Sequence, residues 1–109
     1  MRPIGYVVHT TVIDEDQAFQ IAEHLITRGL CACVQVISGV TSFYKWQGKL
    51  ERTQEHLIFL KTTESQLDGL MDALKKIHPY EVPEIIATPI TSADPEYLKW
   101  MLGSVKNRG

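Results

Sequence analysis

Four consecutive apolar residues, Leu57-Ile58-Phe59-Leu60, constrain the fold of this chain more than any other feature. Successive residues of a β-strand point to opposite faces of the sheet, so an uninterrupted apolar run is typical of a strand with both faces buried. Val7-Val8 and Ile85-Ile86 repeat the pattern over shorter lengths. A sheet built from these segments needs cover on both sides.

Hydrophobic periodicity and turn residues predict four strands. They are expected over residues 4–13, 30–46, 49–62 and 84–91. Ser38-Gly39 indicates a bulge or bend inside the second strand, and Gln47-Gly48 a tight turn before the third.

Three helices are predicted, each with its own start signal. The expected N-caps and their supporting residues are Asp14 with Gln17, Ser65 with Asp68, and Asp94 with Pro95. Gly29 and Pro79 are expected to end the first two helices.

The resulting order, β-α-β-β-α-β with a short C-terminal helix, is that of an α+β ferredoxin-like split sandwich. It forms a single domain over residues 1–109, in which residues 104–109 are expected to be a frayed tail. Right-handed crossovers place both main helices on one face of the sheet. We therefore expect copies of the same chain to cover the other face, in an obligate homo-oligomer.

The long hairpin supports the same expectation. With a turn at Gln47-Gly48, the numbers of paired residues add to about 95, so Trp46 faces Lys49 and Val34 faces Lys61. Each arm would then span about 50 Å at 3.3 Å per residue, whereas a domain of this size is only about 34 Å across. The hairpin should overhang its own domain unless it bends at Gly39, and its bare edges should pair with a neighbour. Head-to-tail contacts that close form a ring, and a trimer is the smallest ring with an axis beyond two-fold.

Composition excludes several classes of function. The formal net charge is −2, with no basic excess for binding nucleic acid. No apolar stretch approaches the roughly 18 residues of a membrane span, and the N-terminal residues lack a signal-peptide pattern, so we expect a cytoplasmic protein. Cys31 and Cys33 should share a strand face, where their spacing suits free thiols better than a disulfide.

Aromatic residues are dense in the segment 39–51, which includes Tyr44 and Trp46. Interfaces between chains use such side chains routinely, and we favour that interpretation. The alternative is a surface that binds a ligand or an apolar peptide.

A second dense segment, residues 78–84, places His78, Tyr80, Glu81 and Glu84 beside a predicted turn. Its prolines are typical of a helix end and a rigid entry into a strand. Loops on a rigid scaffold often carry function, which favours a site role for His78 and Glu81.

These segments resemble the CutA family of divalent-cation tolerance proteins. The match lies in residues 30–34, 39–42, 44–49, 78–85 and 97–100, and it covers nearly the whole chain. The resemblance implies a ferredoxin-like homotrimer, similar in build to PII-type signalling proteins. It also implies binding of copper or another divalent metal, linked to metal-ion tolerance and response.

The copper ligands of some family members are a Cys on the first strand and a His-His pair after the second helix. The corresponding residues here are Thr10 and Ile77-His78, so only His78 keeps a metal-binding side chain. Borderline metals prefer several N or S ligands, so one imidazole predicts a weak site. Cys33 and Thr10 are secondary candidates.

Two functional hypotheses follow. The first is a non-enzymatic, trimeric divalent-metal-binding protein with His78 at weak, intersubunit sites. The second is a PII-like regulatory trimer that binds a small anionic ligand or a partner protein in its intersubunit clefts. Its expected cleft residues are Tyr44, Trp46, Lys49, Lys61, Tyr80, Glu81 and Glu84. A purely structural interaction module is a third interpretation, and the sequence carries no Gly-rich phosphate loop or nucleophile motif that would favour an enzyme.

Overall fold

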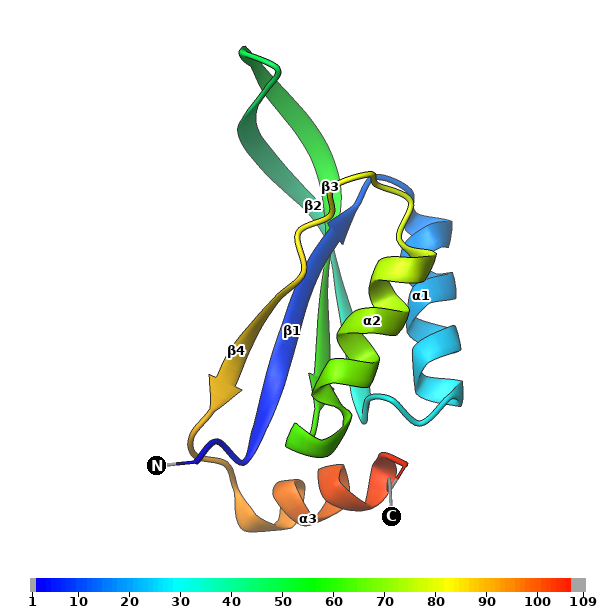
Figure 1. Cartoon of the computed structure of the whole chain (residues 1–109), viewed down its shortest axis with the longest axis vertical. Helices are drawn as coiled ribbons and strands as arrows, with labels where there is room; N and C mark the ends of the chain where they lie inside the picture. The colour runs from blue at the N-terminus through cyan, green and yellow to red at the C-terminus, as the bar shows by residue number, and fades with distance from the viewer. Residues whose placement is uncertain (1, 107–109) are drawn as a thin grey trace.

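A computed structural model, which describes residues 2–106, shows a four-stranded antiparallel sheet and three α-helices (Figure 1). The elements, in chain order, are β1 (Gly5–Val12), α1 (Glu15–Thr27), β2 (Cys33–Trp46), β3 (Lys49–Thr62), the 3-10 turn η1 (Glu64–Gln66), α2 (Leu67–Ile77), β4 (Ile86–Ile90) and α3 (Pro95–Ser104). The strand order β2-β3-β1-β4 is that of the ferredoxin-like fold, so the predicted fold class is confirmed.

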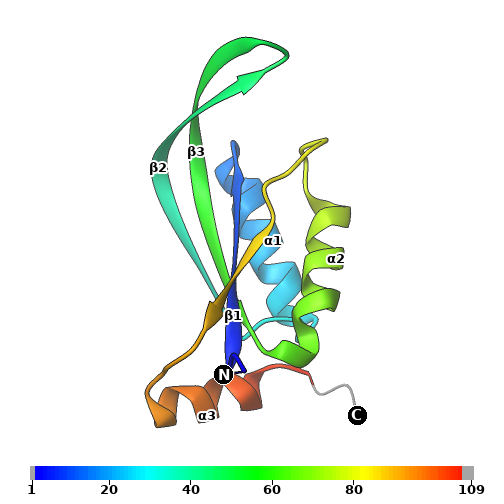
Figure 2. The same cartoon turned by 60° about the vertical axis from the view of Figure 1, so that its left-hand side comes forward.

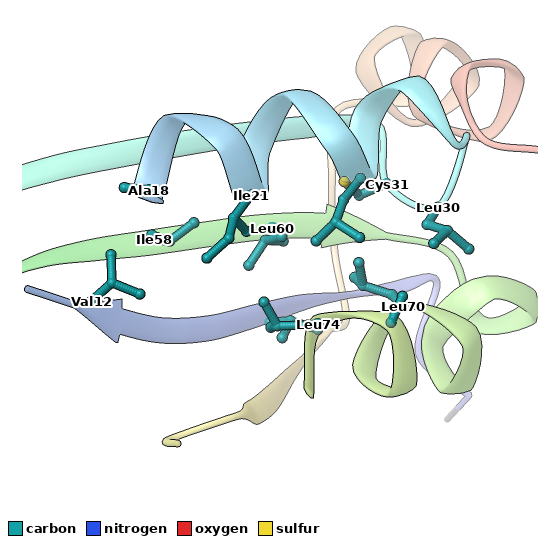
Figure 3. Close-up of a cluster of buried hydrophobic side chains, with 12 residues drawn as sticks. Val12, Ala18, Ile21, Leu30, Cys31, Ile58, Leu60, Leu70 and Leu74 are labelled. Carbon is teal, nitrogen blue, oxygen red and sulfur yellow. The ribbon is translucent and has the colours of Figure 1, made fainter. Parts of the chain in front are cut away.

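Helices α1 and α2 pack on the same face of the sheet, and α3 lies across the end near the N-terminus (Figures 1 and 2). A cluster of buried apolar side chains fills the space between the sheet and the two helices, as Figure 3 shows. Its members include Val8, Val12, Ile21, Leu25, Ile58, Leu60, Leu70 and Leu74. The alternate residues of β1 and β3 supply the sheet side of this core, as the period of two requires.

Two of the three predicted N-caps are confirmed. Asp14 caps α1 and Asp94 caps α3, although the Asp14 carboxylate accepts from the backbone N–H of Asp16 and not from Gln17. The prediction that Ser65 caps the second helix is wrong. Residues 64–66 form a 3-10 turn that starts at Thr63, and α2 follows with Gln66 at its N-cap.

The last strand and the C-terminal segment also differ from expectation. β4 is shorter than predicted because only its residues 86–90 pair with β1. The expected fraying is wrong for residues 104–106: α3 includes Ser104, Val105 is buried, and the Lys106 N–H donates to the Gly29 carbonyl over 2.7 Å. Residues 107–109 lie outside the described residues.

A β-bulge at Ser38 and Gly39 interrupts the long hairpin. Beyond it the predicted register holds, with Trp46 opposite Lys49, but before it the register moves by one residue. Val34 therefore faces Leu60, and the predicted pairing with Lys61 is wrong. An extra residue in one strand of a pair produces this shift.

The hairpin projects well beyond the rest of the sheet (Figure 1). The molecule measures 45 × 28 × 22 Å, and its radius of gyration of 14.6 Å exceeds the roughly 13 Å of a compact domain of this length. The predicted overhang is confirmed.

Within the described residues, no helix covers the face of the sheet opposite α1 and α2 (Figure 2), and several apolar side chains lie on it. It carries Leu57, Phe59, Ile37 and Ile86, and the last two are 47 % and 52 % exposed. Cover of this face by other copies of the chain stays a prediction.

The bulge can be tested through Gly39, whose φ of +82° lies in the left-handed region. We expect Gly39→Val to lower the free energy of unfolding by about 1–3 kcal/mol, because a β-branched residue is strained there. Urea denaturation at fixed protein concentration measures the change. Gly103→Ala, in α3 with open space around its Cα, is the control and should not destabilise the protein. An equal effect of the two substitutions would contradict the assigned role of Gly39.

Candidate functional site

A cleft of about 690 Å³ opens where β1 ends and the hairpin continues alone. The segment between α2 and β4 (yellow in Figure 1) passes beside this point and supplies one wall. The lining residues are Thr11, Ile13, Ser42, Phe43, Tyr44, Trp46, Glu51, Glu55, Tyr80, Glu81, Val82 and Glu84.

The bulge determines which hairpin residues face the cleft. Register pairs Tyr44 with Glu51 and Val40 with Glu55, so these side chains lie on one face of the ribbon. Without the extra residue, Tyr44 and Trp46 would lie on the opposite face from Glu51 and Glu55.

The cleft combines four carboxylates with four aromatic rings. The carboxylates are those of Glu51, Glu55, Glu81 and Glu84, and the rings are those of Phe43, Tyr44, Trp46 and Tyr80. No Lys, Arg or His is among the described residues that line it. The electrostatic potential of such a cleft favours a cation.

Glu55 and Tyr80 join the two walls. The Tyr80 hydroxyl donates to Glu55 Oε2 over 2.5 Å, and Glu55 is only 6 % exposed. Burial, followed by the hydrogen bond to Glu55, raises the pKa of Tyr80 well above its usual value. The phenol therefore remains a proton donor at any physiological pH, and Glu55 accepts from it.

His78 lies beneath the cleft, buried at 8 % exposure. Its Nδ1 accepts the Tyr80 backbone N–H over 3.1 Å, so a neutral ring carries its proton on Nε2. Nε2 lies 3.1 Å from the Thr11 carbonyl oxygen and 2.9 Å from Thr10 Oγ1, which serve as acceptors. Burial lowers the pKa of His78, which favours this neutral form. Both nitrogens are thus occupied within the protein.

The structure brings five of the predicted cleft residues together and separates the other two. Tyr44, Trp46, Tyr80, Glu81 and Glu84 all line the cleft. Lys49 instead occupies the hairpin end, opposite Trp46 in the register, and does not line the cleft. Lys61 is six residues along β3 from Glu55, roughly 20 Å away, with its Nζ 5.7 Å from the centre of the Tyr97 ring.

The candidate metal ligands do not converge. Thr10 contacts His78, but Cys33 pairs with Lys61 at the far end of the sheet. Cys31 precedes the strand and lies in the core, so the expectation that the two cysteines share a strand face is wrong; both thiols are free, as expected. Within residues 2–106, no three His, Cys, Asp or Glu side chains are grouped so that they could hold a metal ion.

Sequence reasoning missed Glu51 and Glu55 as cleft residues. The hairpin register contained the signal, because pairing to a sum of 95 places Glu51 opposite Tyr44. The contact between Glu55 and Tyr80 joins segments 25 residues apart, and no local pattern reveals it.

Fold and cleft together define a small α+β protein of the ferredoxin-like class with a cation-attracting cleft. The family model for the CutA1 divalent ion tolerance protein matches residues 6–104. The chain therefore belongs to the CutA1 divalent ion tolerance family.

Similar proteins agree with this assignment. The divalent-cation tolerance protein CutA of Salmonella newport is 40 % identical over 104 residues, which cover 95 % of this chain and 90 % of that protein. The solved structure of the divalent cation tolerance protein from Thermus thermophilus has a TM-score of 0.90 and 41 % identity, covering 94 % of this chain and all of that one. The periplasmic divalent cation tolerance protein CutA of Archaeoglobus fulgidus has a TM-score of 0.90 and 30 % identity, with 94 % and 100 % coverage.

Within the described part of the chain, no helix has the length and apolar character needed to cross a membrane.

The buried His78 predicts a pH dependence of stability. Its pKa is lower in the folded state than the usual 6.5, so the unfolded chain binds the proton more readily. Stability is therefore complete above about pH 6.5 and falls as the pH drops from there towards the folded-state pKa. We expect the Tm of metal-free protein to fall between pH 7.5 and 5.5, and His78→Gln to reduce that slope.

The matched control is His24→Gln, because His24 is exposed on α1. The change of Tm with pH in this variant should equal that of the unsubstituted protein. At pH 7.5, His78→Gln should also cost about 1–3 kcal/mol through lost buried hydrogen bonds. Equal pH slopes for both variants would contradict the role of His78.

Proposed function

We propose that this protein is a homotrimer that binds a divalent cation at its acidic clefts and acts in divalent-metal tolerance, as a binding protein and not as an enzyme. One observation carries the proposal: four carboxylates line one cleft in a member of the divalent ion tolerance family. The names of the relatives support the metal-related role.

Assembly as a trimer is supported by two surfaces. The helix-free face of the sheet carries exposed apolar side chains, including Ile37 and Ile86. The hairpin overhangs the domain and leaves its strand edges free to pair. A closed ring of three copies would bury the apolar faces and pair the free strand edges at the same time.

The donor atoms of the cleft favour a hard cation over copper. Carboxylate oxygens suit Mg²⁺, Ca²⁺ or Mn²⁺, whereas copper prefers imidazole and thiolate. A copper site at His78 is disfavoured because both ring nitrogens already have partners. Because no complete ligand group exists within the described residues, we propose that a neighbouring copy completes the coordination.

The PII-like alternative, with a small anionic ligand, is less well supported. Four carboxylates repel an anion, and two of the lysines expected to supply positive charge, Lys49 and Lys61, lie outside the cleft. A partner protein remains the more compatible form of this alternative.

We also propose the cytoplasm as the compartment of this protein. The proposal rests on the two free thiols of Cys31 and Cys33, which suit a reducing compartment. The relative from Archaeoglobus fulgidus is named periplasmic, so cell fractionation is the relevant test.

The trimer predicts a single sedimenting species. At micromolar concentration we expect a mass three times the 12.4 kDa of one chain. Phe59→Glu, on the helix-free face, should dissociate it by placing a charge in a dry interface. Glu23→Gln, on the exposed surface of α1, should leave the mass unchanged. A folded single protomer of the unsubstituted protein would rule out the trimer.

The metal site predicts a specific pattern in calorimetry. Mn²⁺ should bind the trimer, and the double substitution Glu81→Gln and Glu84→Gln should weaken binding at least tenfold because it removes two anionic ligands. His78→Gln, in protein that stays folded and trimeric, should weaken Mn²⁺ binding much less than this double substitution, because the ring supports the wall but is not itself a ligand.

Glu23→Gln, which removes one carboxylate outside the cleft, serves as the control and should leave Mn²⁺ binding unchanged. Absence of heat with Mn²⁺, Zn²⁺ and Cu²⁺ at millimolar concentration would remove the proposal. If His78→Gln abolishes Cu²⁺ binding and the glutamate substitutions do not, the metal site would be assigned to His78 and not to the carboxylates.

A further inference from the structure

The cleft has aromatic walls that a bare metal ion does not need. Phe43, Tyr44 and Trp46 come from the hairpin, and Tyr80 comes from the opposite wall. The three hairpin rings are all exposed, although apolar surface of this kind is normally buried.

Aromatic faces and carboxylates have one ligand in common, an organic cation. The negative face of an aromatic ring attracts an ammonium group, and aliphatic carbons pack well against the same ring. A carboxylate beside the rings supplies the charge-assisted hydrogen bond. The volume of about 690 Å³ is within the usual range of small-molecule sites.

Glu55 provides a second, independent indication. Its side chain is buried and lines the cleft, and its Oε2 accepts from Tyr80. No buried side-chain polar atom in the described part of the chain lacks a hydrogen-bond partner, so the other oxygen of Glu55, which has none, is accessible from the cleft. That oxygen is free to accept from a donor or contact a cation that enters the cleft.

We propose that this cleft binds an alkylammonium group, with the ammonium near Glu55 and Glu81 and the aliphatic chain against Tyr44 and Trp46. The chemistry is shared by free polyamines and by lysine side chains of other proteins. This inference concerns the same cleft as the proposed metal function. It predicts that an alkylammonium and a divalent cation compete for the carboxylates.

The test uses the fluorescence of Trp46 in the trimer. Trp100→Phe serves as the background, because Trp46 is then the only tryptophan in the sequence. Cadaverine, titrated in the presence of a chelator, should change the emission with saturation. The diol 1,5-pentanediol, which has the same length without charge, should not.

Substitutions then separate the two interactions. Tyr44→Leu should weaken cadaverine binding about 3- to 10-fold while leaving Mn²⁺ binding unchanged, because it removes only a ring. Glu81→Gln should weaken both ligands, and the distant Glu23→Gln neither. The N-acetylated, C-amidated lysine tests the second source: tighter binding than cadaverine would assign the cleft to a protein side chain.

Each outcome decides between the two claims. Mn²⁺ binding with no response to cadaverine or lysine overturns this inference and leaves the metal function intact. Cadaverine binding without Mn²⁺ binding supports the inference and removes the metal function. Equal responses to cadaverine and pentanediol, or no effect of Tyr44→Leu in a protein that remains trimeric, also overturn the inference.

Discussion

The bulge at Ser38 and Gly39 inserts one residue into β2 and thereby exchanges the two faces of that strand on either side of it. Before the bulge, the odd-numbered residues of β2 share the helix-free face with the odd residues of β3; beyond it, the even-numbered ones do. Tyr44 and Trp46 therefore join Glu51 and Glu55 on one surface. Since Gly39 adopts a positive φ, a single backbone conformation decides which chemistry the cleft presents.

The second wall depends on a chain of hydrogen bonds that begins at His78. The neutral ring is held between β1 and the Tyr80 backbone, and the Tyr80 phenol reaches Glu55 on β3. Three segments distant in sequence are tied together where β1 ends. The same ring therefore has a structural role, because both of its nitrogens have hydrogen-bond partners within the protein.

Features that depend on residues close together in the chain could be predicted from the sequence, whereas features that depend on tertiary contacts could not. Alternation, caps and turn residues predicted the fold and the hairpin register beyond the bulge, and the density of aromatic residues in the hairpin pointed to Tyr44 and Trp46. Lys49 and Lys61 were expected as cationic groups of intersubunit clefts, and within one chain the strand register places both outside this cleft. Ser65 failed as a cap because a 3-10 turn starting at Thr63 precedes the helix. Glu55 could not be found because its partner, Tyr80, is set by tertiary contact.

The position of the cleft links assembly to cation binding. Glu51 and Glu55 lie on the same side of β3 as Leu57 and Phe59, so these two carboxylates continue the helix-free face. If three copies close over that face, water leaves the carboxylates as well as the apolar side chains. Repulsion among desolvated carboxylates then opposes assembly, and a bound cation relieves it. By mass action, a cation that binds the assembled form better than the single chain must also strengthen the assembly. The proposed trimer and the proposed cation site therefore predict that cation concentration and trimer stability are coupled.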